Sequence, residues 1–445
     1  MNKNKDYLIT EKPSRALFAF ALPMIIGNLF QQAYTIVDSA IVGHYVGETA
    51  LAAVGASYAL TSIFICVAIG GGIGASVIIS QHFGGHAYSR MKTSIRTAML
   101  SFLLISLLLG GIGLCFSRQI METLNTPADA MDIAVIYLNI YFYGLPFLFM
   151  YNILSSMFNA LGESRIPLYL LIFSSVLNIF LDLYMVATLH LGVAGAAYAT
   201  FIAQGISAVC SFLIFLRTLR RLDGKAETWF SKAEFSSMSR IALPSILQQS
   251  TVSIGMMLVQ SVVNGFGTQI LAGFSAGMRI ESLCVVPMAA IGNALSSYTA
   301  QNIGAEKHER ISLGYRTANI MVAITAVILC LFLELLHRPL IALFLDGAPS
   351  AQTVATGEGY LRFIGFFFCM IGFKMAVDGI LRGAGAVKVF TIANLVNLGL
   401  RVLIAKLGAP VYGIAMIWYA VPLGWLANFL ISYGYYRTGK WKQIS

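Results

Sequence analysis

The chain has 445 residues, of which 58% are hydrophobic and only 11% are charged, and its mean hydropathy is +0.78. Soluble domains carry roughly a quarter charged residues. The composition therefore excludes a soluble globular protein, a disordered chain, a coiled coil and a secreted disulfide scaffold, and it predicts a polytopic membrane protein. Lys and Arg outnumber Asp and Glu by 29 to 19, giving a net charge of +10. We expect this excess to reflect membrane topology rather than a nucleic-acid partner.

Long apolar segments recur along the chain, separated by short polar connectors. Each segment is long enough to cross a hydrocarbon core of roughly 30 Å as a helix. They lie near residues 16–43, 51–80, 95–117, 131–158, 166–187, 192–216, 239–263, 269–299, 316–336, 353–381, 387–405 and 411–436. The sequence thus predicts an all-α polytopic membrane protein with twelve transmembrane helices.

The loop charges predict how the chain is oriented in the membrane. An even number of spans places both termini on one side, and this side carries 22 Lys and Arg residues against 3 on the other. Cytoplasmic loops are enriched in Lys and Arg. We therefore expect a multi-pass protein of the cell inner (plasma) membrane with both termini in the cytoplasm. The longest charged connector, 217–238, contains Trp229 and Phe230 and is typical of a segment lying along the membrane interface.

The two halves of the chain resemble each other. The motif Ala-Leu-Pro at 21–23 returns at 242–244, and the motif Gln-x-x-Gly at 81–84 returns at 301–304. Gly162 is matched by Gly385, so the offset drifts only from about 220 to 223 residues. A repeat of six spans inserts both copies the same way round, which is the parallel-repeat architecture of some secondary transporters.

From this repeat we predict two pseudo-symmetric six-helix lobes. The expected domains are an N-lobe at 1–216 with helices 1–6, a cytoplasmic linker at 217–238, and a C-lobe at 239–445 with helices 7–12.

Polar residues inside the first-half spans are candidates for an ion site. Asp38 lies in span 1 and Asp182 in span 5, and Asn178 precedes Asp182 by four residues, so these two share a helix face. Thr200 in span 6 adds a hydroxyl oxygen. Intramembrane acids usually mark ion pathways, and such oxygens suit a proton or a hard cation such as Na⁺. The alternative is that both acids are buried, hydrogen-bonded residues with a purely structural role.

The second half differs, because its intramembrane charges are of both signs. Lys374 and Asp378 are four residues apart and can form an ion pair on one helix. Glu281 has two potential partners, Arg401 and Arg362. Structural salt bridges are at least as good an interpretation of these residues as a coupling role.

Three further features favour ordinary packing over chemistry. The six cysteines form no Cys-x-x-Cys pair, and His82 and His86 lack an evident third ligand, so we expect no metal site beyond a possible Na⁺ site. The glycines near 70–74 lack the strand and Lys-Ser/Thr of a nucleotide loop and indicate close helix approach. We find no clustered nucleophile and expect no enzyme activity.

The ordered set of motifs resembles the multidrug and toxic compound extrusion (MATE) family. The motifs are ALPMIIGNLFQQAYTIVDSAIVG in span 1, ALAAVG at the start of span 2, the Gln-x-x-Gly ends of spans 2 and 8, and GILRGAG after span 10. The resemblance covers nearly the whole chain. It implies a secondary active transporter that exchanges H⁺ or Na⁺ for amphipathic, often cationic compounds by alternating access, without a cofactor.

Within this family the chain is most similar to the DinF-like prokaryotic branch. The resemblance implies that Asp38, Asn178, Asp182 and Thr200 form the cation-coupling site of the N-lobe, and that Pro23 is the proline at which helix 1 bends. A static packing kink at Pro23 is the alternative. The candidates for the substrate cavity are Gln31, Tyr137, Asn152, Glu281 and Asp378. Another branch uses a Glu on helix 7, where this chain has Gln248 and Gln249, and an Asp on helix 10, where Asp378 lies late in the span.

A lipid-linked precursor flippase of a related fold is the rival transport function. The first-half acids favour cationic cargo, whereas Arg279, Arg362 and Arg401 favour the flippase. As partners we expect small amphipathic cationic drugs or dyes and membrane lipids, and we expect the protein to be a monomer.

Overall fold

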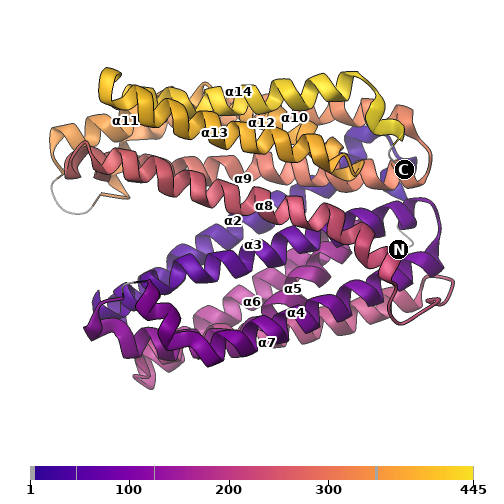
Figure 1. The fold of residues 1–445 in the computed structure, drawn as a ribbon, viewed down its shortest axis with the longest axis horizontal. Helices are drawn as coiled ribbons and strands as arrows, with labels where there is room; N and C mark the ends of the chain where they lie inside the picture. Colours follow the sequence, from indigo (N-terminus) through magenta and orange to yellow (C-terminus); the bar gives the residue numbers. More distant parts are fainter. Residues whose placement is uncertain (1–5, 47, 125, 346–348, 444–445) are drawn as a thin grey trace. The chain divides into compact units, whose positions relative to one another are not determined.

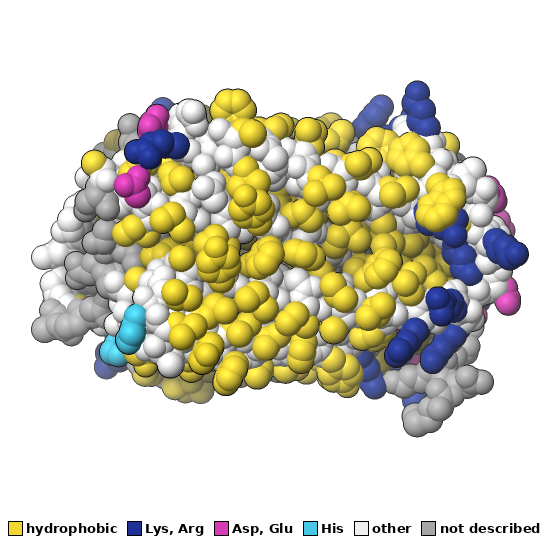
Figure 2. All heavy atoms as spheres, turned by 90° about the horizontal axis from the view of Figure 1, so that it is seen from below, with side chains coloured by type: hydrophobic (Ala, Val, Ile, Leu, Met, Phe, Trp, Pro, Cys, Tyr) yellow, Lys and Arg dark blue, Asp and Glu magenta, His cyan; other side chains and the backbone are white. Residues whose placement is uncertain are grey.

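The computed structural model describes residues 6–46, 48–124, 126–345 and 349–443, and this part of the chain consists of helices and their connections (Figure 1). Two of the basic residues that contribute to the predicted orientation, Lys3 and Lys5, lie outside the described residues. Figure 2 shows hydrophobic side chains over most of the face that it draws, with Lys and Arg side chains gathered toward one end. An apolar surface of this kind is what a membrane-spanning protein presents to lipid.

The helices follow one another with short connections. Their bounds are α1 (Tyr7–Thr10), α2 (Pro13–Val46), α3 (Glu48–Gly84), α4 (Tyr88–Thr123), α5 (Ala128–Ala160), α6 (Arg165–Asp182), a π-helical turn (Leu183–Thr188), α7 (Gly192–Arg220), α8 (Lys232–Asn264), α9 (Thr268–Gly304), α10 (His308–Ala342), α11 (Ala351–Gly365), α12 (Phe368–Gly383), α13 (Val387–Tyr412), α14 (Ala415–Arg437) and a short 3₁₀ helix (Lys440–Gln443).

The predicted fold class is confirmed. In the described residues, eleven helices are long and apolar enough to cross a membrane, and α11 and α12 meet the same criterion as a pair bent by 52°, which gives up to twelve spans. The break falls at residues 366–367, inside the predicted span 353–381. The last predicted span begins too early, at 411, because α13 continues to Tyr412 and Gly413, with φ +76°, separates it from α14.

The internal repeat is visible in the backbone. His86 (φ 54°) and Glu306 (φ 59°) both adopt the left-handed conformation after α3 and α9, which end in the two Gln-x-x-Gly motifs. Gly162 and Gly385, with φ values of 79° and 75°, follow α5 and α12 in the same way. Few non-glycine residues adopt positive φ, so the matching conformations at 86 and 306 are independent support for two copies of one ancestral unit.

The chain forms two compact units, 26–246 and a second unit that combines 1–25 with 247–445. Within the first unit α3, α4, α5 and α7 lie side by side, and within the second α9 contacts α10, α11 and α12 (Figure 1). The unit boundaries fall inside two continuous helices, α2 and α8, two residues after Pro23 and Pro244 respectively. The N-terminal part of each helix therefore packs with the other half of the sequence, which the predicted boundaries at 216 and 239 did not anticipate.

Equivalent side chains anchor these two crossing segments. At the end of α9, Asn302 donates to the carbonyl oxygen of Leu8 at 3.1 Å. Lys307, directly before α10, donates to the carbonyl oxygen of Ile9 at 3.0 Å. Both contacts hold α1, which precedes the first span, within the unit that contains 247–445.

In the 26–246 unit the anchor is a buried carboxylate. Glu234, in the first turn of α8, contacts His82 Nε2 at 3.0 Å and Arg90 at 3.3 Å, and it accepts a hydrogen bond from Ser94 at 2.7 Å. His82 is the repeat partner of Asn302. The two Gln-x-x-Gly motifs thus end α3 and α9. The last turn of α3 contacts the start of α8, which leads into the second repeat, and the last turn of α9 contacts α1, which leads into the first repeat.

Close helix approach explains the glycine cluster at 70–74. A Cβ atom on Gly70 would lie 2.5 Å from the backbone nitrogen of Ile246, and one on Gly74 would lie 2.6 Å from that of Ala242. Small residues let backbones approach closely in membrane proteins. The predicted packing role of these glycines is therefore confirmed. Gly70 and Gly74 face the N-terminal part of α8, whereas Gly71 faces Phe102 of α4 and Gly72 faces Ser156 of α5.

Candidate functional site

The polar residues predicted from the first half converge within the 26–246 unit. Asp38 comes from α2, Asn178 and Asp182 from α6, and Thr200 from α7. Asn178 and Asp182 are buried, with 2% and 0% of their surface exposed. The side chains of Asn178 and Thr200 are 3.2 Å apart, so three helices bring amide, hydroxyl and carboxyl oxygens together.

The surroundings of Asn178 define the orientation of its amide. When the amide oxygen faces Thr200, it accepts from the Thr200 backbone nitrogen at 3.1 Å and from its hydroxyl at 3.2 Å. The amide nitrogen then donates to Asp182 Oδ2 at 2.7 Å and to the Tyr34 hydroxyl oxygen at 3.0 Å. Amide nitrogen and oxygen are assigned from such networks, and this orientation satisfies both ends.

The two acids face each other, and no basic side chain among the described residues pairs with either of them. The carboxyl groups of Asp38 and Asp182 interact directly, and two carboxyl groups can share a hydrogen bond only when one of them carries a proton. Within the described residues neither group forms an ion pair, and the Oδ1 atom of each is buried without a hydrogen-bond partner. Unsatisfied buried oxygens of this kind need an explanation, and a bound cation or proton supplies one.

Asp182 also marks a change in backbone geometry. It is the last residue of α6, and the chain continues as a π-helical turn over Leu183–Thr188. Single π-helical turns occur often at functional sites. Here the π-helical turn begins directly after Asp182, so the irregular backbone lies next to the buried carboxyl group.

A small polar cavity of about 90 Å³ adjoins this cluster. Two of the predicted cavity residues, Gln31 and Asn152, line it together with Tyr34, Asn178 and Thr200. Tyr137, on α5, interacts electrostatically with both acids. The structure therefore brings the three first-half candidates to the surroundings of the acid pair.

The second-half candidates have partners of their own in the other unit. Asp378 contacts Lys374 Nζ at 3.0 Å and accepts a hydrogen bond from Ser432 at 2.7 Å. Glu281 accepts a hydrogen bond from the Tyr360 hydroxyl group and interacts with Arg401. Of the two partners left open by the sequence, Arg362 instead pairs with Glu334 at 3.1 Å.

Tyr34 is the residue of this cluster that sequence reasoning missed. It precedes Asp38 by four residues, so both project from the same face of α2. That spacing is the only signal the sequence offered, and aromatic residues at helical spacing are far more common in apolar packing. The hydrogen bond to Asn178 identifies Tyr34 as part of the polar cluster.

Known proteins match this chain over nearly its whole length. A family profile described as MatE matches residues 23–184 and 244–407, once in each repeat. The chain is 30% identical to the probable multidrug resistance protein YpnP of Bacillus subtilis, over 97% of this chain and 96% of that protein. It is 26% identical to the probable multidrug resistance protein YoeA of the same organism, over 100% and 99%. A transporter structure of the MOP superfamily from Pyrococcus furiosus superposes with a TM-score of 0.91 at 22% identity, covering 99% of this chain and 98% of that one.

Proposed function

Because this chain belongs to the MATE family of membrane transporters, we propose that it is a secondary active exporter that exchanges H⁺ or Na⁺ for amphipathic, often cationic compounds. A transporter of this family is not an enzyme, and its chemistry consists of binding and conformational change. The single observation that supports cation coupling most directly is the pair formed by Asp38 and Asp182, which lies in a buried polar cluster without a basic partner among the described residues.

The proposed mechanism is competition between the driving cation and the cargo. A proton or a Na⁺ ion neutralises the acid pair, with Asn178 and Thr200 supplying further oxygens for the ion. A ligand shifts a conformational equilibrium only through different affinities for the two states. We therefore propose that loading favours one conformation of α2 around Pro23, next to the unit boundary at 25–26, and that cargo leaves as that conformation forms.

Dye efflux from proteoliposomes tests this function. Vesicles containing the purified protein and an ethidium-like dye should lose the dye when a proton or Na⁺ gradient is imposed, and protein-free vesicles should retain it. Running the two gradients separately identifies the coupling ion. If no dye in a broad panel moves under either gradient while a lipid-linked precursor is translocated, the flippase function replaces this proposal.

We further propose that both termini and the 217–238 connector face the cytoplasm of the producing cell, as the loop charges predict. Thr228 is exposed in this connector, and Ala128 is exposed at the start of α5, on the predicted outer side. In a background whose six cysteines are replaced, an impermeant thiol reagent applied to intact cells should label Ala128→Cys and leave Thr228→Cys unlabelled until the cells are opened. The reverse labelling pattern would invert the topology.

A further inference from the structure

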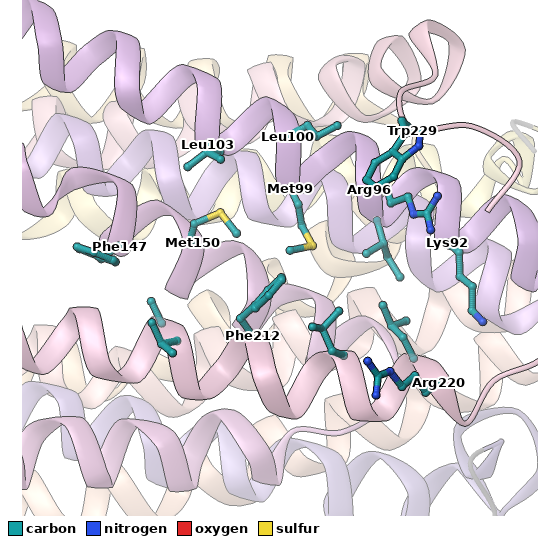
Figure 3. Close-up of a pocket in the computed structure, with 15 residues that line it drawn as sticks. Lys92, Arg96, Met99, Leu100, Leu103, Phe147, Met150, Phe212, Arg220 and Trp229 are labelled. Carbon is teal, nitrogen blue, oxygen red and sulfur yellow. The ribbon is translucent and has the colours of Figure 1, made fainter. Parts of the chain in front are cut away.

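A second and larger cavity lies on the 26–246 unit, apart from the acid cluster. It has a volume of about 680 Å³ and runs between α4, α5 and α7 to the connector after α7 (Figure 3). None of the residues of the acid cluster lines it. The lining residues are Lys92, Ile95, Arg96, Met99, Leu100, Leu103, Phe147, Met150, Ala208, Val209, Phe212, Leu216, Leu219, Arg220 and Trp229. We call this cavity the α4–α7 groove.

Most of the α4–α7 groove is apolar and opens toward lipid. Figure 3 shows Met99 of α4 and Phe212 of α7 pointing toward one another across it, with Phe147 and Met150 of α5 at its far end. Its neighbours on α4 and α7 include exposed hydrophobic side chains, such as Leu104 at 64% and Leu213 at 52% exposure. Since such residues face acyl chains in a membrane-spanning protein, the groove is continuous with the hydrocarbon of the bilayer.

The opposite end of the groove is basic. Lys92, Arg96 and Arg220 lie there together with Trp229 (Figure 3). Lys92 already donates to the carbonyl oxygens of Leu222 and Gly224, at 2.7 and 2.8 Å. Arg96 and Arg220 are exposed, and within the described part of the chain neither forms an ion pair with an acidic side chain. Two arginines are therefore available to an anion at this end.

Trp229 indicates that this basic end lies at the level of the lipid headgroups. Its indole ring stacks under the Arg96 guanidinium group at 4.7 Å and is itself 74% exposed. Trp is enriched where hydrocarbon meets headgroups, and stacking on an aromatic face leaves the edge of a guanidinium group free to bind phosphate. An apolar groove that ends in Trp and two arginines thus matches a molecule with an acyl tail and a phosphate.

We propose that the α4–α7 groove binds one anionic phospholipid, with its phosphate on Arg96 and Arg220 and an acyl chain along Met99, Phe212 and Phe147. Charge selects this occupant. The two arginines repel the cationic compounds proposed as cargo and attract phosphate, with which Arg forms charge-assisted, often bidentate hydrogen bonds. This lipid site does not depend on the proposed transport reaction, since binding is expected whether or not the protein moves a dye.

Lipid retention by the purified full-length protein tests the proposal. The protein is loaded with phosphatidylglycerol or phosphatidylcholine of identical acyl chains, and the lipid that stays bound is counted by native mass spectrometry. Phosphatidylglycerol should bind roughly tenfold more tightly than phosphatidylcholine, since each basic residue near an anionic headgroup adds to the attraction. Equal retention of the two lipids would overturn the proposal.

Three further arms separate the alternatives. Arg96→Gln with Arg220→Gln should abolish the preference for phosphatidylglycerol, whereas Arg165→Gln with Lys225→Gln, an equal charge change at exposed residues outside the groove, should preserve it. Val209→Trp keeps both arginines and fills the apolar part, so it should also reduce retention. Glycerol phosphate added as a competitor should not displace the lipid. Unchanged retention in both groove variants, or displacement by the free headgroup, would refute a lipid site.

Discussion

Replacing either Asp38 or Asp182 by Asn is expected to abolish gradient-driven efflux while leaving folded protein in the membrane. The amide is nearly the same size as the carboxyl group, but it neither ionises nor exchanges a proton, so the driving cation loses its counter-charge. The remaining acid then lacks the partner with which it interacts in the wild-type protein. We expect active transport in proteoliposomes to fall to the level of protein-free vesicles.

Asp378→Asn provides the matched control in the other unit. Asp378 is paired with Lys374 at 3.0 Å, and removing one partner of a buried ion pair leaves an uncompensated charge at a cost of about 3–5 kcal/mol. This variant should therefore yield less folded protein, but the protein that folds should still couple transport to the gradient. Full gradient-driven efflux by the Asp38→Asn, Asp182→Asn double variant would rule out the mechanism and move the coupling site to the second half of the chain.

The second large effect is expected from Gly74→Leu. A Cβ atom there would lie 2.6 Å from the backbone of Ala242, and a helix backbone cannot move aside as a flexible side chain can. Overpacking a well-packed interior costs typically 1–3 kcal/mol, and we expect about 3 kcal/mol or more where the obstacle is backbone. The variant should unfold at a lower temperature in detergent or fail to accumulate.

Gly111→Leu is the control for this prediction. Gly111 also lies in a membrane-spanning helix, α4, but nothing lies within 4 Å of a Cβ atom built on it. The side chain is therefore expected to enter lipid with little change in thermal stability. If Gly111→Leu is as damaging as Gly74→Leu, helix flexibility rather than the contact with α8 determines the loss.

The acid cluster was largely predictable, because it depends on rules that act within one helix. Asn178 and Asp182 share a face through their spacing of four residues, and a carboxylate within an apolar span is conspicuous. Tyr34 was missed, since a tyrosine in such a span has no such signature. Its role became visible only when α6 was placed beside α2, which depends on packing between residues about 140 positions apart.

The α4–α7 groove could not be predicted from the sequence for a related reason. Arg96 and Arg220 were visible as loop charges, and Trp229 as an interfacial aromatic residue, but each also fits a plain cytoplasmic surface. What makes them a site is that α4, α7 and the connector meet around one cavity. Hydropathy and charge patterns give the depth of a residue in the membrane, but they do not specify which helices lie next to one another.

Residues 1–25 pack in the unit that contains 247–445, and this affects the order in which the chain assembles. Leu8, Leu17 and Phe20 are almost fully buried in one hydrophobic cluster with Phe274, Tyr360 and Phe390. The ribosome synthesises Leu8, Leu17 and Phe20 more than 250 residues before the other three. The N-terminal segment therefore cannot complete its packing until the second half of the chain has been made. We expect chains that stop before residue 247 to retain an unpartnered apolar segment at 7–25, and cellular quality control to remove them even though all six helices of the first repeat are present.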